Sequence, residues 1–329
     1  MNFDDILSRT QFSTKEAFEK YAANMPQSKV NGIRQRFNEE MARIKDKYDG
    51  SDIPEEEIMR NELQAYISQL VPLIQREYGE YIPADRIEKL YRLMNDPSRV
   101  IVINNDKINH DFSANSTEGI IIVNLAKIGV SNESPNPSIY RKVANAESVL
   151  PHELFHFVIK MLKPEYMENA RIRIQLSNGE KISSKGMSGF MLNEGFVEKM
   201  ANKFCNEYGL FYTPAIQYYP YIDTCKYIME NNPQVNEQTV FCLDAEDCLN
   251  GLSEQDREKY HKAEAIAYAI RHKDKQASDV VSSELEPIEV DLSNIPEKDK
   301  IRLEREEFYK NQKKEELLPS ENKEKGVTL

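Results

Sequence analysis

One short stretch, residues 149–158, most constrains how this chain can fold, because it sets two histidines among hydrophobic residues. His152 and His156 are four positions apart, so on a helix both imidazoles leave the same face. That spacing lets two ring nitrogens reach one Zn²⁺ at roughly 2.0–2.1 Å. Glu153 completes the pattern His-Glu-x-x-His, in which the glutamate is a general base. Two buried imidazoles need partners, so the stretch predicts a metal-binding helix.

A third ligand is expected, because catalytic zinc usually has three protein ligands and one water. The best source is a second predicted helix at 191–204, which follows the motif at a distance that leaves room for an intervening hairpin. On it, Glu194 precedes Gly195, and a glycine there would allow the two helices to approach closely. Glu198 lies one turn later and could instead hydrogen-bond a ligating histidine. The roles of the two glutamates could also be exchanged.

The motif together with residues 191–197, Met-Leu-Asn-Glu-Gly-Phe-Val, resembles the gluzincin metallopeptidases, the thermolysin-like and aminopeptidase-like zincins. The resemblance implies a zincin-like α+β catalytic domain with one zinc ion, and it favours Glu194 as the third ligand. Residues 198–204 also resemble a stretch of the repressor-cleaving metallopeptidases of mobile elements, which would favour Glu198. The match at Glu194 is longer and includes the glycine, so Glu194 is preferred.

Zinc-assisted hydrolysis of a protein or peptide substrate is the activity that this resemblance implies. The expected site consists of the catalytic base Glu153 and the zinc ligands His152, His156 and Glu194. No aminopeptidase signature precedes the motif, so an endopeptidase is expected. The alternatives are a non-catalytic zincin-fold binding module and a repressor-cleaving or translocated effector protease. Candidates for an oxyanion-stabilising donor are Tyr212, Tyr218, Tyr219, Tyr221 and His261.

Three regions are predicted along the chain. Residues 1–97 read as a helical region, 98–275 as the zincin-like metallopeptidase domain, and 276–329 as a charged, flexible tail with an amphipathic helix at 300–312 as an alternative. Apolar periodicity and capping residues predict helices at 15–23, 31–48, 54–74, 84–93, 145–161 and 253–272.

Short β-branched runs at 100–104 and 119–124 predict strands just before the motif helix. The second run is expected to offer an unpaired edge to an extended peptide, although an ordinary paired strand fits these residues equally well. Alternation on both sides of Asn178-Gly179 predicts a hairpin over 171–183. Pro151 interrupts the motif helix, which therefore either begins near Leu150 or bends just before His152.

The composition argues against two classes of partner, nucleic acids and membranes. A net charge of −12 and a pI of about 5.1 argue against general nucleic-acid binding, which needs a basic surface. No stretch approaches the roughly 18 apolar residues of a membrane span, and the acidic start is unlike a signal peptide. Four cysteines without metal-knuckle spacing are too few for a disulfide framework, so a cytoplasmic location is expected, with non-classical export as the alternative. The sequence does not reveal the oligomeric state.

Overall fold

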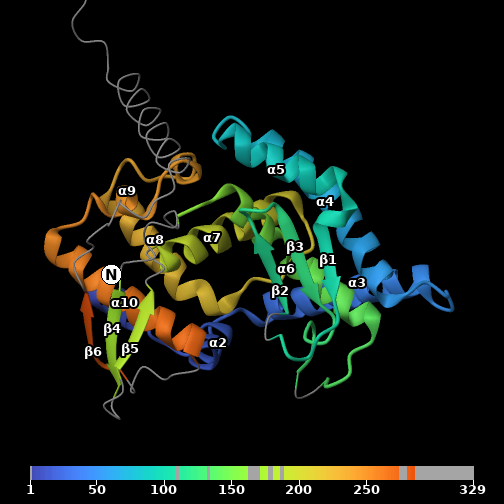
Figure 1. Ribbon diagram of the computed structural model, residues 1–329, viewed down its shortest axis with the longest axis horizontal. Coiled ribbons are helices and arrows are strands. Elements are labelled where there is room, and N and C mark those ends of the chain that lie inside the picture. The colour runs from blue at the N-terminus through green and yellow to red at the C-terminus, as the bar shows by residue number, and fades with distance from the viewer. Residues whose placement is uncertain are drawn as a thin grey trace, which may run out of the picture. The chain divides into compact units, whose positions relative to one another are not determined.

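The computed structural model describes residues 2–108, 111–131, 134–161, 171–176, 181–185, 189–273 and 280–285. Met1–Glu286 forms one compact unit, and the second unit, Pro287–Leu329, lies outside the described residues together with the predicted helix at 300–312. The described part is a mixed α+β structure in which helices predominate (Figure 1). The predicted division at 97 and 275 stays a prediction.

Five helices occupy the first 97 residues: α1 (Phe3–Thr10), α2 (Thr14–Ala23), α3 (Gln27–Tyr48), α4 (Glu55–Tyr78) and α5 (Ala84–Asn95). The four predicted there are confirmed, and α1 is an additional one. Ser13 begins α2 with a capping box that includes Glu16. Pro54 precedes α4, whose first turn is entirely acidic and so complements the helix dipole.

The first sheet contains β1 (Val100–Ile103), β2 (Phe112–Asn115) and β3 (Ile120–Asn124) in the order β1-β3-β2. β3 is parallel to β1 and antiparallel to β2, with Ile122 opposite Ile101 and Ser113. The prediction that 119–124 offers an unpaired edge is therefore wrong, because this strand is paired on both sides. The edge strand nearest the motif helix is β2, whose four partly exposed residues lack the alternation that would reveal a strand.

The motif helix α6 (Ile139–Val158) begins with Ser138 as its cap and continues through Pro151. The helix thus starts six residues before the predicted 145, and of the two alternatives for Pro151 the one with a start near Leu150 is wrong. Proline at 151 lacks an N–H and disturbs the hydrogen bonds one turn earlier. The carbonyl of Ser148, in that turn, accepts a hydrogen bond of 2.9 Å from the Thr213 N–H, which ties this part of the helix to the later chain.

The remaining elements follow the motif helix. They are β4 (Arg171–Leu176), β5 (Lys181–Lys185), α7 (Phe190–Tyr208), the 3₁₀ turn η3 (Ile216–Tyr218), α8 (Tyr219–Asn231), α9 (Ala245–Leu249), α10 (Glu254–Lys273) and β6 (Val280–Leu285). β4 and β5 pair antiparallel, so the predicted hairpin is confirmed, and β6 adds to β4. A side chain at Gly195 would meet Cys225 Sγ and Tyr221 O at 2.7 Å. This glycine therefore permits close packing of α7 on α8, not on α6 as expected.

The motif helix lies in the middle of the core, where α3, α4, α5, α7 and β2 pack around it (Figure 1). Leu150, Leu154 and Phe155 are completely buried. The ring of Phe155 meets those of Tyr78 and Phe204 edge-on at 5.9 and 5.7 Å between centroids. This packing holds α6 and α7 in a defined mutual register, on which the site depends.

Candidate metal centre

The two motif histidines and Glu194 converge at the contact between α6 and α7. His152 Nε2 lies 3.1 Å from His156 Nε2 and 3.3 Å from Glu194 Oε2, and His156 Nε2 lies 3.7 Å from the same oxygen. Tetrahedral coordination with bonds of about 2.0–2.2 Å places ligand atoms roughly 3.3–3.5 Å apart. The three atoms therefore have the mutual distances of three corners around one ion, and the group could hold a metal ion.

Glu198 lies on the other side of His152. Its Oε2 is 3.0 Å from His152 Nδ1 and accepts a hydrogen bond of 2.6 Å from the Tyr212 hydroxyl. Its Oε1 accepts the Ala215 N–H at 3.0 Å. Glu198 is completely buried, and all these bonds turn it away from the two Nε2 atoms. The geometry thus matches the arrangement in which Glu194 faces the ion and Glu198 orients the ligating histidine.

Asn193 performs the corresponding task for His156, a role that sequence reasoning did not assign. Its Oδ1 accepts the Met161 N–H at 3.1 Å, and its Nδ2 lies 3.0 Å from His156 Nδ1. The amide therefore connects the end of the motif helix to the start of the ligand helix and sets the orientation of the second imidazole. With Oδ1 held by the Met161 N–H, Nδ2 is the atom presented to His156, so His156 Nδ1 is the acceptor in this arrangement.

The carboxylates and imidazoles of this cluster shift one another's pKa values. Burial by itself lowers the pKa of His152, but its hydrogen bonds to Glu194 and Glu198 outweigh burial and raise the pKa to about 10. Burial lowers the pKa of His156 to about 4. Burial would raise the pKa of Glu194, yet both histidines act against it and the pKa is lowered. Without an ion, a proton on His152 balances part of the negative charge; a bound cation would replace it.

Glu153 lies beside the cluster and faces the edge of the first sheet. Its Oε2 accepts a hydrogen bond of 2.8 Å from the Ala114 N–H, in strand β2. Burial raises the pKa of Glu153 to about 7, although the charge of His152 opposes this rise. A carboxylate with a pKa near neutrality can both accept and return a proton, as a general base must.

Tyr218, the last residue of η3, is the predicted donor that lies nearest the metal ligands. Its ring stacks on His152 with 5.4 Å between centroids and 12° between planes. Its hydroxyl lies near enough to the carboxylate of Glu194 to help lower the pKa of that group. Tyr218 therefore contacts two of the three residues that could hold an ion.

The other predicted donors contact other parts of the structure. Tyr219 meets Tyr21 edge-on at 5.7 Å, and Tyr221 is completely buried in the core. His261 lies against the ring of Tyr260 on α10. Tyr212, as described above, is bonded to the buried carboxylate of Glu198.

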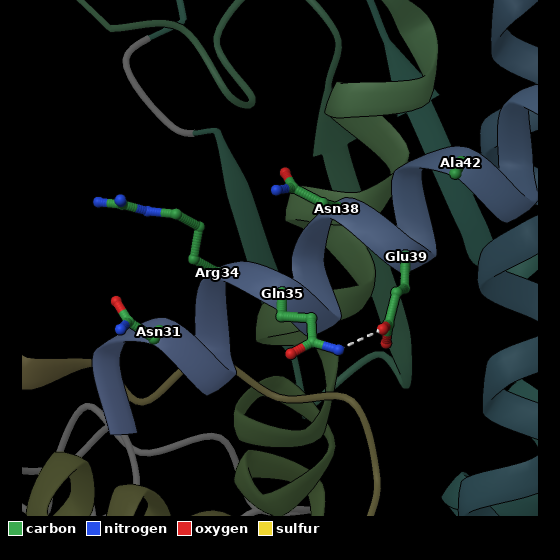
Figure 2. A pocket seen from close by; sticks show the side chains of 6 residues that line it. All are labelled: Asn31, Arg34, Gln35, Asn38, Glu39 and Ala42. Atoms are coloured by element: carbon green, nitrogen blue, oxygen red, sulfur yellow. Dashed lines mark hydrogen bonds between the residues drawn. The ribbon is translucent and has the colours of Figure 1, made fainter. Parts of the chain in front are cut away.

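A hollow of about 480 Å³ lies away from the metal cluster, on the outer face of α3. It is lined by Asn31, Arg34, Gln35, Asn38, Glu39 and Ala42, which are all exposed (Figure 2). Gln35 donates a hydrogen bond of 2.8 Å to Glu39, and Arg34 extends away from the helix. Solvated side chains of a single helix line this hollow, so we assign no chemistry to it.

No described helix is both long enough and apolar enough to cross a membrane. Comparison of the chain with protein-family models, with curated proteins and with solved structures found no match. The geometry of His152, His156 and Glu194 is therefore the feature of this chain that bears on its function.

Proposed function

We propose that this protein is a zinc-dependent metallopeptidase that cleaves within peptide chains. The observation that supports the proposal most strongly is the combination of three converging ligand atoms with Glu153 beside them. A structural metal site needs the ligands but has no use for a neighbouring carboxylate of raised pKa. Zinc, rather than another metal, is favoured by the mixed nitrogen and oxygen ligand set and the tetrahedral spacing.

His152, His156 and Glu194 would hold the ion, which when bound would lower the pKa of water and polarise the scissile carbonyl. Glu153 accepts the proton of the attacking water and passes it to the leaving amine. The Tyr218 hydroxyl is the donor closest to the developing oxyanion, because it lies against a ligand carboxylate. Removal of such a donor in comparable sites slows turnover by about 100-fold or more.

An extended substrate would lie along β2, which among the described residues pairs only with β3. The Ala114 N–H donates to Glu153 and therefore points away from β3, toward the free edge. A peptide that adds to this edge would offer its own carbonyl to the same N–H. Glu153 would then lose its backbone donor and turn to the attacking water.

The decisive experiment compares the wild type with Glu153→Gln, with the exposed Glu118→Gln as a control for the loss of one charge. All three proteins are assayed for bound zinc and for cleavage of a broad peptide library. We expect zinc in all three, and loss of cleavage by about 100-fold or more only in Glu153→Gln. Zinc binding with no cleavage that depends on Glu153 would favour the non-catalytic binding module. Absence of zinc from the wild type would contradict the metal assignment.

A further inference from the structure

The wall of the site that carries Tyr218 is contacted from outside by the first two helices of the chain. α2 packs against η3, the turn that ends at Tyr218. Tyr21 of α2 also meets Tyr219 edge-on, one residue after the ring that stacks on His152. The N-terminal helix pair, residues 3–23, therefore lies directly behind the aromatic wall of the candidate site.

This helix pair is anchored firmly on α8 and α10. α1 packs on both helices and buries Phe3, Ile6 and Leu7. The ring of Phe3 stacks on Tyr227 with 4.4 Å between centroids and 12° between planes. Complete burial of such side chains contributes about 1.5–3 kcal/mol each, so α1 is a stable base for α2.

A polar cluster ties both helices of the pair to α8, just after η3. Asp223 Oδ2 accepts hydrogen bonds of 3.1 Å from Arg9 Nη1 on α1 and from the Tyr21 hydroxyl on α2. Arg9 Nη1 also lies 3.3 Å from that hydroxyl. The Arg9 and Asp223 side chains are only 25% and 21% exposed, so solvent screens this pair less than a surface ion pair.

By contrast, η3 has little internal support. It consists of three residues with no side-chain cap, and 3₁₀ turns of this length have poor hydrogen-bond geometry. The Ala215 N–H, just before it, is held by Glu198, and the Tyr218 ring rests on His152. Tyr218 therefore lies between the metal cluster, the Tyr221 ring of α8 at 5.9 Å between centroids, and α2 behind η3.

We propose that the N-terminal helix pair is a positioning element of the site, which holds η3 so that the Tyr218 ring stays stacked on His152. The consequence for turnover rests on the proposed function. The mechanical coupling between α2 and η3 does not, because it is a property of the folded chain whether or not peptides are cleaved.

Two alanines on α2 allow a matched test in the full-length protein. Ala17 is completely buried, whereas Ala23 is exposed on the same helix. Ala17→Leu adds three carbon atoms to the buried face of α2 and should displace the helix, whereas Ala23→Leu adds the same atoms where they face solvent. Hydrogen exchange of the Tyr218 amide, which bonds Ala215 O at 2.9 Å, reports the state of η3. We expect the Tyr218 amide to exchange about tenfold faster than in the wild type in Ala17→Leu, and at the wild-type rate in Ala23→Leu.

Tyr21→Phe supplies a second variant should Ala17→Leu fail to fold, because it removes only the bonds to Asp223 and Arg9. We expect faster exchange at Tyr218 in this variant also, by about threefold. Zinc affinity, measured by competition with a chelator, should stay within about threefold of wild type in both variants, since the ligands lie on α6 and α7. Unchanged exchange in both variants would overturn the coupling. Loss of zinc together with faster exchange would show general unfolding and would overturn the positioning role.

Turnover provides the final measurement with the zinc-loaded protein. We expect Ala17→Leu to lower kcat by about tenfold with little change in KM, and to have no further effect in a Tyr218→Phe background. Additive losses in the double variant would overturn the proposed route through Tyr218. Failure of the proposed function would show itself differently, as absence of zinc-dependent cleavage in the wild type, and the exchange results would still decide the coupling.

Discussion

The motif helix contributes to two clusters of charged side chains, each of which contains buried carboxylates. The rear cluster, toward α3 and α4, consists of Glu40, Glu62, Glu147, Arg43 and Lys47. The metal cluster, toward α7, consists of His152, His156, Glu194 and Glu198. Both gather carboxylates in the protein interior, where an uncompensated charge is costly. They differ in what compensates those carboxylates.

The rear cluster contains its own cations. Arg43 Nη2 lies 2.7 Å from Glu62 and 3.2 Å from Glu147, and Lys47 Nζ lies 2.7 Å from Glu62. These contacts outweigh burial and lower the pKa of Glu62. Burial and the nearby Glu40 raise the pKa of Glu147 to about 9, so a proton neutralises the remaining charge. The charges of the rear cluster therefore balance without a bound ion.

The metal cluster has no such cation. In the part of the chain that the structure describes, no lysine or arginine lies within ion-pairing distance of Glu194 or Glu198. The basic groups that face these carboxylates are the two imidazoles, of which His152 holds a proton without an ion. Two clusters with similar carboxylates thus differ in the positive charge that they contain, and at the metal cluster a bound cation would supply it.

The largest expected effect is on zinc affinity, which should depend on the metal cluster and not on the rear cluster. Glu194→Ala should weaken zinc binding by more than about 100-fold, because it removes a ligand itself rather than a residue behind one. Glu147→Gln, in the rear cluster, should leave zinc affinity unchanged. Competition with a chromophoric chelator measures both. Normal affinity in Glu194→Ala would instead point to Glu198 as the third ligand.

Zinc affinity should also depend steeply on pH. Since the pKa of His152 is raised to about 10 without an ion, zinc must displace a proton from it at neutral pH. Affinity should therefore rise about tenfold for each pH unit between about 6 and 8, with release of about one proton. Calorimetric titrations in buffers of different ionisation enthalpy measure that proton. A pH-independent affinity would contradict the charge balance described for the metal cluster.

A smaller change is expected at Glu198, which within the metal cluster contacts His152 and not the two Nε2 atoms. Glu198→Ala should lower zinc affinity by about 10–100-fold, because His152 loses the partner that orients its ring. The same chelator competition measures it, and the exposed Glu207→Ala on the same helix serves as the control. A loss as large as that in Glu194→Ala would show that the two glutamates share the ligand role.

The smallest effect concerns stability and belongs to the rear cluster. The pKa of Glu147 is about 9 in the folded chain, against an ordinary value of 4.5, so between these pH values only the folded state holds the proton. The free energy of unfolding should therefore fall as pH rises from about 5 to 9. The full pKa difference corresponds to about 6 kcal/mol, and solvent around the half-exposed Arg43 should reduce this to about 1–3 kcal/mol. Glu147→Gln should flatten this dependence in urea unfolding, while the exposed Glu39→Gln should not. An unchanged slope would show that Glu147 is ionised when folded.

Local pattern predicted most of the secondary structure. Apolar periodicity located the helices that became α2 to α7 and α10, and Asn178-Gly179 located the β4–β5 hairpin. It failed for β2, which is four residues long and has no buried face to create alternation. It also misplaced the start of α6, because Pro151 is tolerated inside the helix, where the Ser148 carbonyl of the preceding turn accepts the Thr213 N–H.

What the sequence by itself determined is the chemistry of the ligands: His152 and His156 share a helix face at any tertiary arrangement, and Glu194 was the preferred third group. Strand order was not determined, because pairing depends on neighbours far along the chain; β3 took the centre and left the edge to β2. The division of roles between Glu194 and Glu198 was also undetermined, since both leave the same face of α7. Only the packing of α7 on α6, with Tyr218 brought in by η3, decided which carboxylate meets the two imidazoles.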